Sequence, residues 1–328
     1  LYSLKFDAMF LIFDTETTGL PKNNKAPISD TDNWPRCVQL AWQLHCSDGS
    51  LIESKSFIIK PDNGYDIPYS VEQVHGISTA LANNQGHELQ KVLNEFLLAL
   101  ERAKFVVGQN ISFDIPILLC EFFRYKLDNK LAEKPILDTC TEKTAAICKL
   151  PGGRGGKFKY PKLSELHKHL FDASFIEAHN ASADVEATAR CFFELIRLKY
   201  FTNTELEFDK QAVNDFFEKN TTQIKAIGLK HLNLKKESAK YKANEHIDEL
   251  DIDVKSILKT LENVPFSHLH NHSQYSVLQS TTKIPKLISK ASEYGMPAVA
   301  LTDSASLMSA FNFMAEADKH NKRIDAKI

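Results

Sequence analysis

The sequence lacks closely spaced cysteines, a long apolar run and an excess of charge of one sign. Its six cysteines are scattered, and the closest two, Cys140 and Cys148, stand eight residues apart. This spacing predicts neither a CxxC metal knuckle nor a disulfide scaffold, and it fits a reducing cytoplasm. No apolar run approaches the ~20 residues of a membrane span. We therefore expect a cytoplasmic protein without membrane contact.

Charge and length limit how the protein can contact nucleic acid and how many domains it has. Lysine and arginine together number 40, against 42 aspartates and glutamates. The molecule as a whole therefore has no positive field, and any contact with nucleic acid must come from local patches. The 328 residues are 43% hydrophobic and 25% charged, which is ordinary for a globular protein. This length exceeds the about 100–200 residues of one domain, so we expect two domains.

The order of the predicted elements indicates a mixed α/β fold. Predicted strands cover 10–13, 38–44, 56–59 and 105–107, and predicted helices cover 88–102, a segment after 112, and 182–200. Strands first, and then strands that alternate with helices, indicate a central sheet flanked by helices.

The composition changes near residue 202, where large apolar residues become rare and charged residues become more frequent. Between Lys225 and Lys242 there are six lysines and one acid. This composition favours a partly helical, solvated connector, and a DNA clamp is the less favoured interpretation. A core-like pattern returns after residue 264, with predicted strands at 266–269 and 298–301 and a helix at 285–294. The predicted domains are 9–201, a connector over 202–263, and 264–328.

An apolar run at 10–13 ends in the acids Asp14 and Glu16. In a strand, residues two apart point to the same face, so these carboxylates project together while Thr15 points away. Two adjacent carboxylates repel, and either a proton or a cation such as Mg²⁺ or Mn²⁺ relieves the repulsion. A lone pair of this kind on a surface strand is usually just solvated, so further acids must converge on it.

Two further acids stand at strand-to-helix junctions. Asp114 follows the strand at 105–107, and Asp184 follows His179 in the first turn of the last helix. Each acid could instead stabilise a helix N-terminus by roughly 0.3–1 kcal/mol, and His179 alone could be a surface histidine. The conjunction of all of them favours a metal site.

The motifs FDTETTG at 13–19, Asn110-x3-Asp114 and His179-x4-Asp184 resemble those of the DEDDh family of 3′→5′ exonucleases, and VHGI at 74–77 matches a further family segment. The resemblance implies an RNase H-like fold and two Mg²⁺ or Mn²⁺ ions. It implies that Asp14, Glu16 and Asp184 hold one ion, that Asp114 places the second, and that His179 is the general base. It also implies substrate contacts at Thr17, Thr18, Leu20, His75, Asn110 and Phe113.

Some features depart from that family or extend beyond it. Members often have histidine where Gln109 stands, and the insertion at 22–34 is unusual and is interpreted as a lid or docking surface. The loop at 152–162 places lysines beside two aromatic residues, which suits phosphate contact and equally suits a flexible surface loop.

A second signature begins at residue 266. It resembles the start of the PHP domain at the front of bacterial DNA polymerase III alpha subunits. His270 and His272 share a strand face and could be remnants of a metal site. At least two family ligands are missing, because Gln279 and Ser304 stand where acid and histidine are common. A working phosphoesterase is therefore not expected.

The resemblance favours a metal-dependent 3′→5′ DNA exonuclease that proofreads for a replicative polymerase III alpha subunit. Its expected partners are a DNA 3′ end, either single-stranded or at a frayed primer terminus, and polymerase domains further along the full chain, with the sliding clamp as another candidate. Two alternatives stay open. One is an RNA-trimming exonuclease, because the motifs do not distinguish sugars. The other is a mainly structural or binding module of the polymerase.

Overall fold

The computed structural model describes residues 9–62, 64–175, 179–244, 264–277, 279–304 and 307–324. The chain divides into two compact units, residues 1–246 and 247–328. Each unit is described by itself. Among the described helices, none combines the length and the apolar character that a membrane crossing requires.

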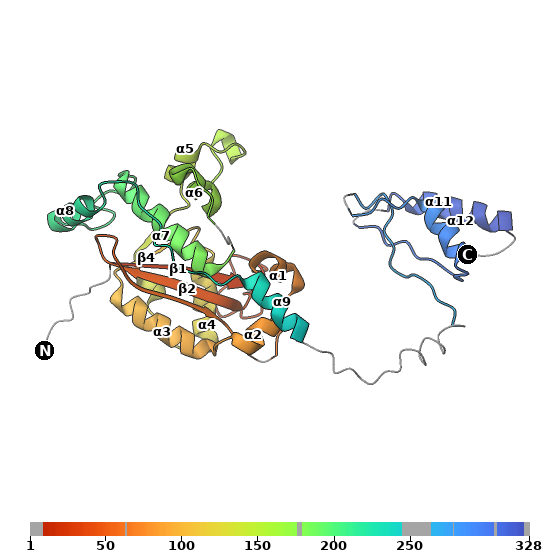
Figure 1. The fold of residues 1–328 in the computed structure, drawn as a ribbon, viewed down its shortest axis with the longest axis horizontal. Helices are drawn as coiled ribbons and strands as arrows, with labels where there is room; N and C mark the ends of the chain where they lie inside the picture. Colours follow the sequence, from red (N-terminus) through yellow and green to blue (C-terminus); the bar gives the residue numbers. More distant parts are fainter. Residues whose placement is uncertain are drawn as a thin grey trace. The chain divides into compact units, whose positions relative to one another are not determined.

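A five-stranded mixed sheet organises the first unit, in the order β3-β2-β1-β4-β5 (Figure 1). β2 pairs antiparallel with both β1 and β3, whereas β4 runs parallel to β1 and β5 runs parallel to β4. The strands are β1 (Phe10–Thr17), β2 (Cys37–His45), β3 (Leu51–Ile58), β4 (Phe105–Gly108) and β5 (Ile136–Asp138). This arrangement is the RNase H-like fold that the sequence motifs imply, and the predicted mixed sheet with flanking helices is confirmed.

Helices cover both faces of the sheet. α3 (Leu89–Arg102) and α4 (Asp114–Arg124) lie on one face, and α7 (Ala181–Arg197) lies on the other (Figure 1). Odd residues of β1, such as Phe13, pack with α3 and α4, whereas the even residue Phe10 packs with α7. The strand is four residues longer than the predicted 10–13. Because the alternation continues along it, its last acids turn toward α7 and Thr15 turns toward α4.

The remaining helices of the first unit are short. They are α1 (Tyr69–His75), α2 (Thr79–Gln85), η1 (Leu131–Glu133), α5 (Glu142–Cys148), η2 (Arg154–Gly156) and α6 (Leu163–Phe171), followed by α8 (Lys210–Lys219) and α9 (Leu234–Asn244). The insertion at 22–34 lies against α4, where Arg124 donates hydrogen bonds to the carbonyls of Thr31 and Trp34.

Residues 202–244 belong to the same compact unit as the sheet. They contain two helices and carry the charge that the sequence indicates, and they also carry four buried apolar side chains. Leu206, Phe208 and Phe216 pack with the α7 face of the sheet, and Leu234 packs with Val38 and Ile77. This part of the connector is therefore attached to the exonuclease-like unit. The three predicted domain ranges stay a prediction.

The described part of the second unit contains α11 (Ile284–Glu293) and α12 (Ala310–Ile324) and no strand. The helix predicted at 285–294 is present, but the strands predicted at 266–269 and 298–301 are not. Ala300 and Thr302 donate backbone hydrogen bonds to the carbonyls of His268 and Asn271. The donors are two residues apart and the acceptors three, so the two segments share no regular strand register.

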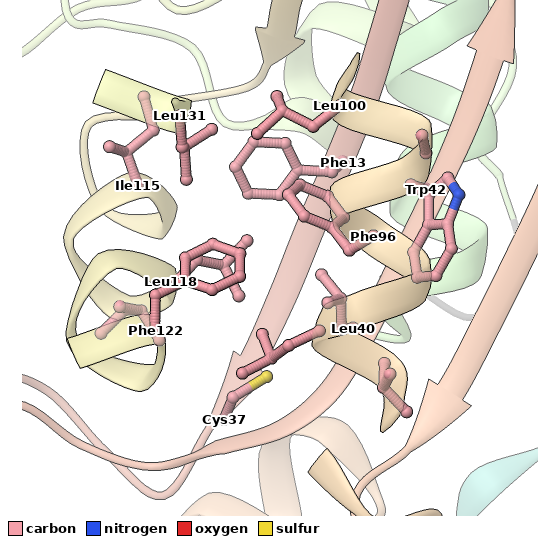
Figure 2. Packing of buried hydrophobic residues seen from close by; sticks show 14 of the residues in the cluster. Phe13, Cys37, Leu40, Trp42, Phe96, Leu100, Ile115, Leu118, Phe122 and Leu131 are labelled. Carbon is pink, nitrogen blue, oxygen red and sulfur yellow. The ribbon is translucent and has the colours of Figure 1, made fainter. Parts of the chain in front are cut away.

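Phe96 on α3 fills the centre of one core. Its ring is fully buried and meets Phe13 and Trp42 edge-on, with centroids 5.3 and 5.6 Å away (Figure 2). We expect Phe96→Ala to lower the free energy of unfolding by about 3–5 kcal/mol, because it leaves a cavity among these rings. Denaturant titration followed by tryptophan fluorescence measures this change, since both tryptophans, Trp34 and Trp42, lie in the first unit.

The matched control is Leu98→Ala on the same helix, whose side chain is 63% exposed. This change should alter the free energy of unfolding by less than about 0.5 kcal/mol. Equal losses in the two variants would contradict the packing described here.

His45 on β2 is buried beneath the Phe193 ring. Burial lowers its pKa to about 4, so the folded unit holds it neutral while the unfolded chain protonates it near pH 6.5. Its contribution to stability is therefore complete above pH 6.5 and is lost as the pH falls toward 4. We expect a loss of about 2 kcal/mol between pH 7 and 5, measured as the difference in unfolding free energy between the wild type and His45→Gln. Identical pH dependences in the two proteins would refute this assignment.

Candidate active site

Three segments meet at the carboxyl end of β1: the strand itself, the N-terminus of α4 and the N-terminus of α7. Ligand atoms of Glu16, His179 and Asp184 all lie within 4.8 Å of one another. Glu16 faces α7 because it lies on the even side of the strand. Among the described residues, these three form the one group of three or more histidine, cysteine or acidic side chains close enough to share a metal ion, and neither Asp14 nor Asp114 belongs to it.

Asp114 lies on the α4 side, near enough for its charge to raise the pKa values of Asp14 and Glu16. Its Oδ1 accepts hydrogen bonds from the backbone N–H of Thr15 at 3.0 Å and from the Thr15 hydroxyl at 2.6 Å. Both residues are buried. Thr15 therefore fixes one oxygen of Asp114. Thr15 was predicted only to point away from the acids, and its position between Asp14 and Glu16 is the signal that could have identified its role.

The pKa values of all four carboxyl groups are raised. Burial, and then the charges of Asp114, Asp184 and Glu16, raise the pKa of Asp14 well above its ordinary value. Burial and the charges of Asp184 and Asp114 raise the pKa of Glu16 to about 9. Burial raises the pKa values of Asp114 and Asp184 to about 7. These groups cannot all be ionised at neutral pH unless a cation neutralises them.

The donors fit a hard divalent cation. Carboxylate oxygens are the ligands that Mg²⁺ and Mn²⁺ prefer. Oδ1 of Asp184 is buried and has no hydrogen-bond partner within the described parts of the chain. A buried acceptor without a partner costs about 1–3 kcal/mol, and a bound ion would remove that cost.

The start of α7 is fixed by a network that the sequence did not predict. Asn180 caps the helix, and its Oδ1 accepts from Ser182 and from Nε2 of Gln39 at 3.0 Å. Oε1 of Gln39 accepts from the N–H of Ala181. Because Gln39 on β2 pairs with Glu16 on β1, this one amide fixes the helix N-terminus to the strand that carries the acids.

His179 directly precedes the cap and lies at the mouth of the cluster. Its side chain is exposed, and its backbone adopts a φ of 68°, which non-glycine residues rarely adopt. Its N–H donates to Oδ2 of Asp184 at 3.1 Å. This bond holds the unusual turn and brings the imidazole beside the carboxylates.

The substrate contacts predicted at the end of β1 and just after it are Thr17, Thr18 and Leu20. The Thr17 hydroxyl donates to the carbonyl of Gly19, and the Thr18 hydroxyl accepts from the N–H of Arg36. Both hydroxyls therefore shape the turn. Leu20 is 81% exposed, so a large apolar side chain stands free just after the acids.

His75 is buried at the end of α1. Its Nδ1 accepts from the N–H of Ile77, so the ring hydrogen is on Nε2, which has no hydrogen-bond partner within the described residues. Burial lowers the pKa of His75 to about 4, and the ring is therefore neutral. A neutral imidazole can donate one hydrogen bond from Nε2 to a ligand.

The turn after β4 contains Asn110, and Asp138 at the end of β5 stabilises it through a hydrogen bond. Asn110 has a φ of 60°, and its N–H donates to Oδ1 of Asp138, an acid that the sequence analysis missed. Its signal is the short apolar pair before it. Gln109 donates to the carbonyl of Pro161, which ties the basic loop at 152–162 to this turn. Phe113 is partly buried against the α3 and α4 core.

The histidines of the second unit make a separate pair. Nε2 of His270 and Nε2 of His272 lie 3.1 Å apart. Asp303 accepts from the Ser273 N–H and from the hydroxyls of Ser273 and Ser276, so its oxygens are already used. No third ligand joins the two histidines among the residues that the structure describes in this unit.

Two family profiles match the chain, one described as Exonuclease over residues 11–192 and one described as PHP domain over residues 268–328. Curated relatives named DNA polymerase III PolC-type are 26% identical over 195 residues in Halalkalibacterium halodurans and 24% identical over 234 residues in Clostridium perfringens. These alignments cover 58% and 69% of this chain, but only 12% and 14% of the relatives. DNA polymerase III subunit alpha of Chlamydia muridarum is 53% identical over 45 residues, which are 14% of this chain and 4% of that protein.

Solved structures of E. coli Exonuclease I are also similar. The complex with a dT13 oligonucleotide has a TM-score of 0.47 at 19% identity, and the complex with dA16 has a TM-score of 0.46 at 21% identity. Each match covers 63% of this chain and 45% of that chain.

Exonucleases of this family depend on metal ions, which agrees with the raised pKa values of the carboxyl groups at the end of β1. The Exonuclease profile spans more than half of the chain, from β1 to the helix that carries Asp184. The protein therefore belongs to the Exonuclease family, is homologous to PolC-type DNA polymerase III, and carries a partial PHP domain after its exonuclease region.

Proposed function

We propose that the first unit is a metal-dependent 3′→5′ DNA exonuclease that removes nucleotides from a primer end and proofreads for a replicative polymerase. The observation that carries this proposal is the convergence of Glu16, His179 and Asp184 within 4.8 Å, next to a buried carboxylate oxygen without a partner. The polymerase context is supported by relatives named as DNA polymerases and by the partial PHP domain.

Asp14, Glu16 and Asp184 would hold one Mg²⁺ or Mn²⁺ ion, and Asp114 would place a second. When bound, these ions supply positive charge that activates water and stabilises the leaving 3′ oxygen. The chain's own contribution is to hold the oxygens in place. Thr15 fixes Asp114 from one side of the sheet, and Gln39 and Asn180 fix the start of α7 from the other.

His179 is proposed as the general base. It is exposed beside Glu16 and Asp184, so its ring can meet both solvent and the scissile phosphate. An imidazole near neutral pH is suited to taking a proton from the attacking water. Its backbone bond to Asp184 keeps the ring at the mouth of the site.

The terminal nucleotide is proposed to lie between Leu20 and His75. The exposed Leu20 side chain offers an apolar surface to a base, and Nε2 of His75 offers a hydrogen-bond donor. The backbone at Thr17 and Thr18 would border the sugar, with Asn110 and Phe113 along the strand. Contacts of this kind accept any base, as a proofreader requires.

The deciding experiment measures nucleotide release from a primer with a 3′ mismatch, in the presence of Mg²⁺. Release from the 3′ end that stops with EDTA supports the proposal. Comparing rates on DNA and RNA of one sequence identifies the sugar preference, and faster release from RNA would replace DNA proofreading by RNA trimming. No release from either substrate would leave a binding module of the polymerase as the function.

A further inference from the structure

Helix α7 carries a row of polar side chains at four-residue spacing: Ser182, Glu186, Arg190 and Glu194. Because an α-helix makes a turn every 3.6 residues, these four share one face. Asp184 lies about 200° around the helix from Ser182 and from Glu186, and so on the opposite face. The row therefore faces away from the proposed metal site.

A single segment of the connector covers this row. At the far end, the carbonyl of Ile224 accepts from Arg190 at 3.0 Å, and the N–H of Ile224 donates to Glu194 at 2.9 Å. Further along, the N–H of Gly228 donates to Oε1 of Glu186 at 2.6 Å. The segment thus runs antiparallel to α7, toward the end of the helix that carries Asp184.

His231 makes the contact closest to the site. Its Nε2 bonds to Oε2 of Glu186 at 2.7 Å, and its Nδ1 lies 3.0 Å from the hydroxyl of Ser182. Two residues before Ser182, the Asn180 amide donates to the carbonyl of Leu232 at 2.9 Å. The order of serine, histidine and glutamate resembles a hydrolase triad. However, the Ser182 hydroxyl also donates to Oδ1 of Asn180, so it belongs to the cap of the helix.

The same segment of the connector continues to the turn that follows α1. Leu234 is buried, and the Ser238 hydroxyl donates to the carbonyl of Gly76 at 2.6 Å and accepts from the N–H of Ser78 at 2.9 Å. Gly76 has a φ of 81°, and a Cβ there would lie 2.9 Å from the backbone nitrogen of Lys235. This turn directly follows His75.

We propose that residues 224–241 form a strap that positions the active site from behind, and that His231 is the positioning residue that fixes the strap to the start of α7. The hydrogen bonds described above join the strap to Ser182, Glu186 and Asn180, and not to the acids of the proposed metal site themselves. It holds the two segments that carry Asp184 and His75. This inference rests on the proposed function, because it concerns the same metal ions.

The expected effect is on metal binding. Outer residues that orient metal ligands typically change metal affinity 10–100-fold. His231→Ala removes the contact between the strap and Ser182 and one of the donors to Glu186, so the N-terminal turn of α7 gains freedom. In the full chain, we expect the Mn²⁺ concentration at half-saturation to rise about 10-fold. KM for a DNA oligonucleotide should stay within about 2-fold, and kcat should recover at saturating Mn²⁺.

Two further variants sharpen the test. Glu186→Gln keeps the shape of the side chain but removes the charge that binds His231, and it should weaken Mn²⁺ binding in the same direction. Lys230→Ala is the matched control, because this neighbouring strap side chain is exposed, and it should bind Mn²⁺ like the wild type. Calorimetric titration with Mn²⁺ measures binding without relying on activity.

Weaker Mn²⁺ binding in His231→Ala and Glu186→Gln, with normal binding in Lys230→Ala, supports the strap. Unchanged binding in both test variants overturns it, and so does loss of the fold in both, which would make the segment purely structural. A wild type that binds Mn²⁺ but degrades no nucleic acid rejects the proposed exonuclease and still leaves the strap to be decided by binding. A wild type that binds no Mn²⁺ overturns both.

Discussion

Replacing Asp14 by asparagine is expected to slow nucleotide release from a 3′ end about 10³-fold. The change removes one charge from the proposed metal ligands while keeping the size of the side chain. Charge stabilisation by a bound metal contributes several kcal/mol to a transition state, and each 1.36 kcal/mol corresponds to a factor of ten in rate. Single-turnover release from a 5′-labelled primer with a 3′ mismatch, at saturating Mg²⁺, measures the change.

Asp128→Asn is the matched control for this experiment. Asp128 is exposed just beyond the end of α4 opposite Asp114, and its replacement should leave the rate within about 2-fold, as expected for surface changes. If Asp14→Asn retained more than a tenth of the wild-type rate, Asp14 could not hold an essential ion. The cluster would then need another explanation.

Divalent cations are expected to stabilise the first unit strongly. Without an ion, burial and mutual repulsion disfavour the charged carboxylates, which is why the pKa of Glu16 is raised to about 9. An ion at 100 times its dissociation constant adds about 2.7 kcal/mol to the unfolding free energy. For a unit of this size the midpoint of thermal unfolding should rise by about 5–10 °C, measured by tryptophan fluorescence with and without Mn²⁺.

In EDTA, Asp14→Asn should not lower the midpoint of thermal unfolding. Asparagine cannot ionise, so the variant avoids the free energy needed to keep Asp14 protonated among the other carboxyl groups, and without metal it should unfold at a temperature equal to or above that of the wild type. The variant should also lose most of its response to Mn²⁺. A variant that is less stable than the wild type in EDTA and still responds fully to Mn²⁺ would exclude a metal-holding role for Asp14.

The mixed sheet could be predicted from the sequence, because strands and their order depend largely on local patterns. Apolar runs located β1, β2 and β4, whereas the strand predicted at 56–59 overlaps only the end of β3 and β5 was missed. The alternation along β1 places Asp14 and Glu16 on one side of the strand and Thr15 on the other. Such alternation is a property of the backbone and needs no tertiary information.

The bracing contacts could not be predicted in this way. Gln39 lies 141 residues from Asn180, and His231 lies 45 residues from Glu186, so no short-range pattern joins them. The composition of the connector indicated a solvated surface. Its few apolar residues, such as Phe216 and Leu234, were outnumbered by charges, although these two are the residues that attach it. In the second unit, the strands predicted from short apolar runs failed because the two segments share no regular register.

The attachment of residues 202–244 also bears on how the chain can be divided for laboratory work. A fragment that stopped at 201, where the composition changes, would expose the apolar surfaces that Phe216 and Leu234 cover. Exposed apolar patches favour aggregation. A fragment that continues to residue 244 keeps both surfaces covered. The shortest fragment that keeps the core of the first unit covered should therefore end near residue 244.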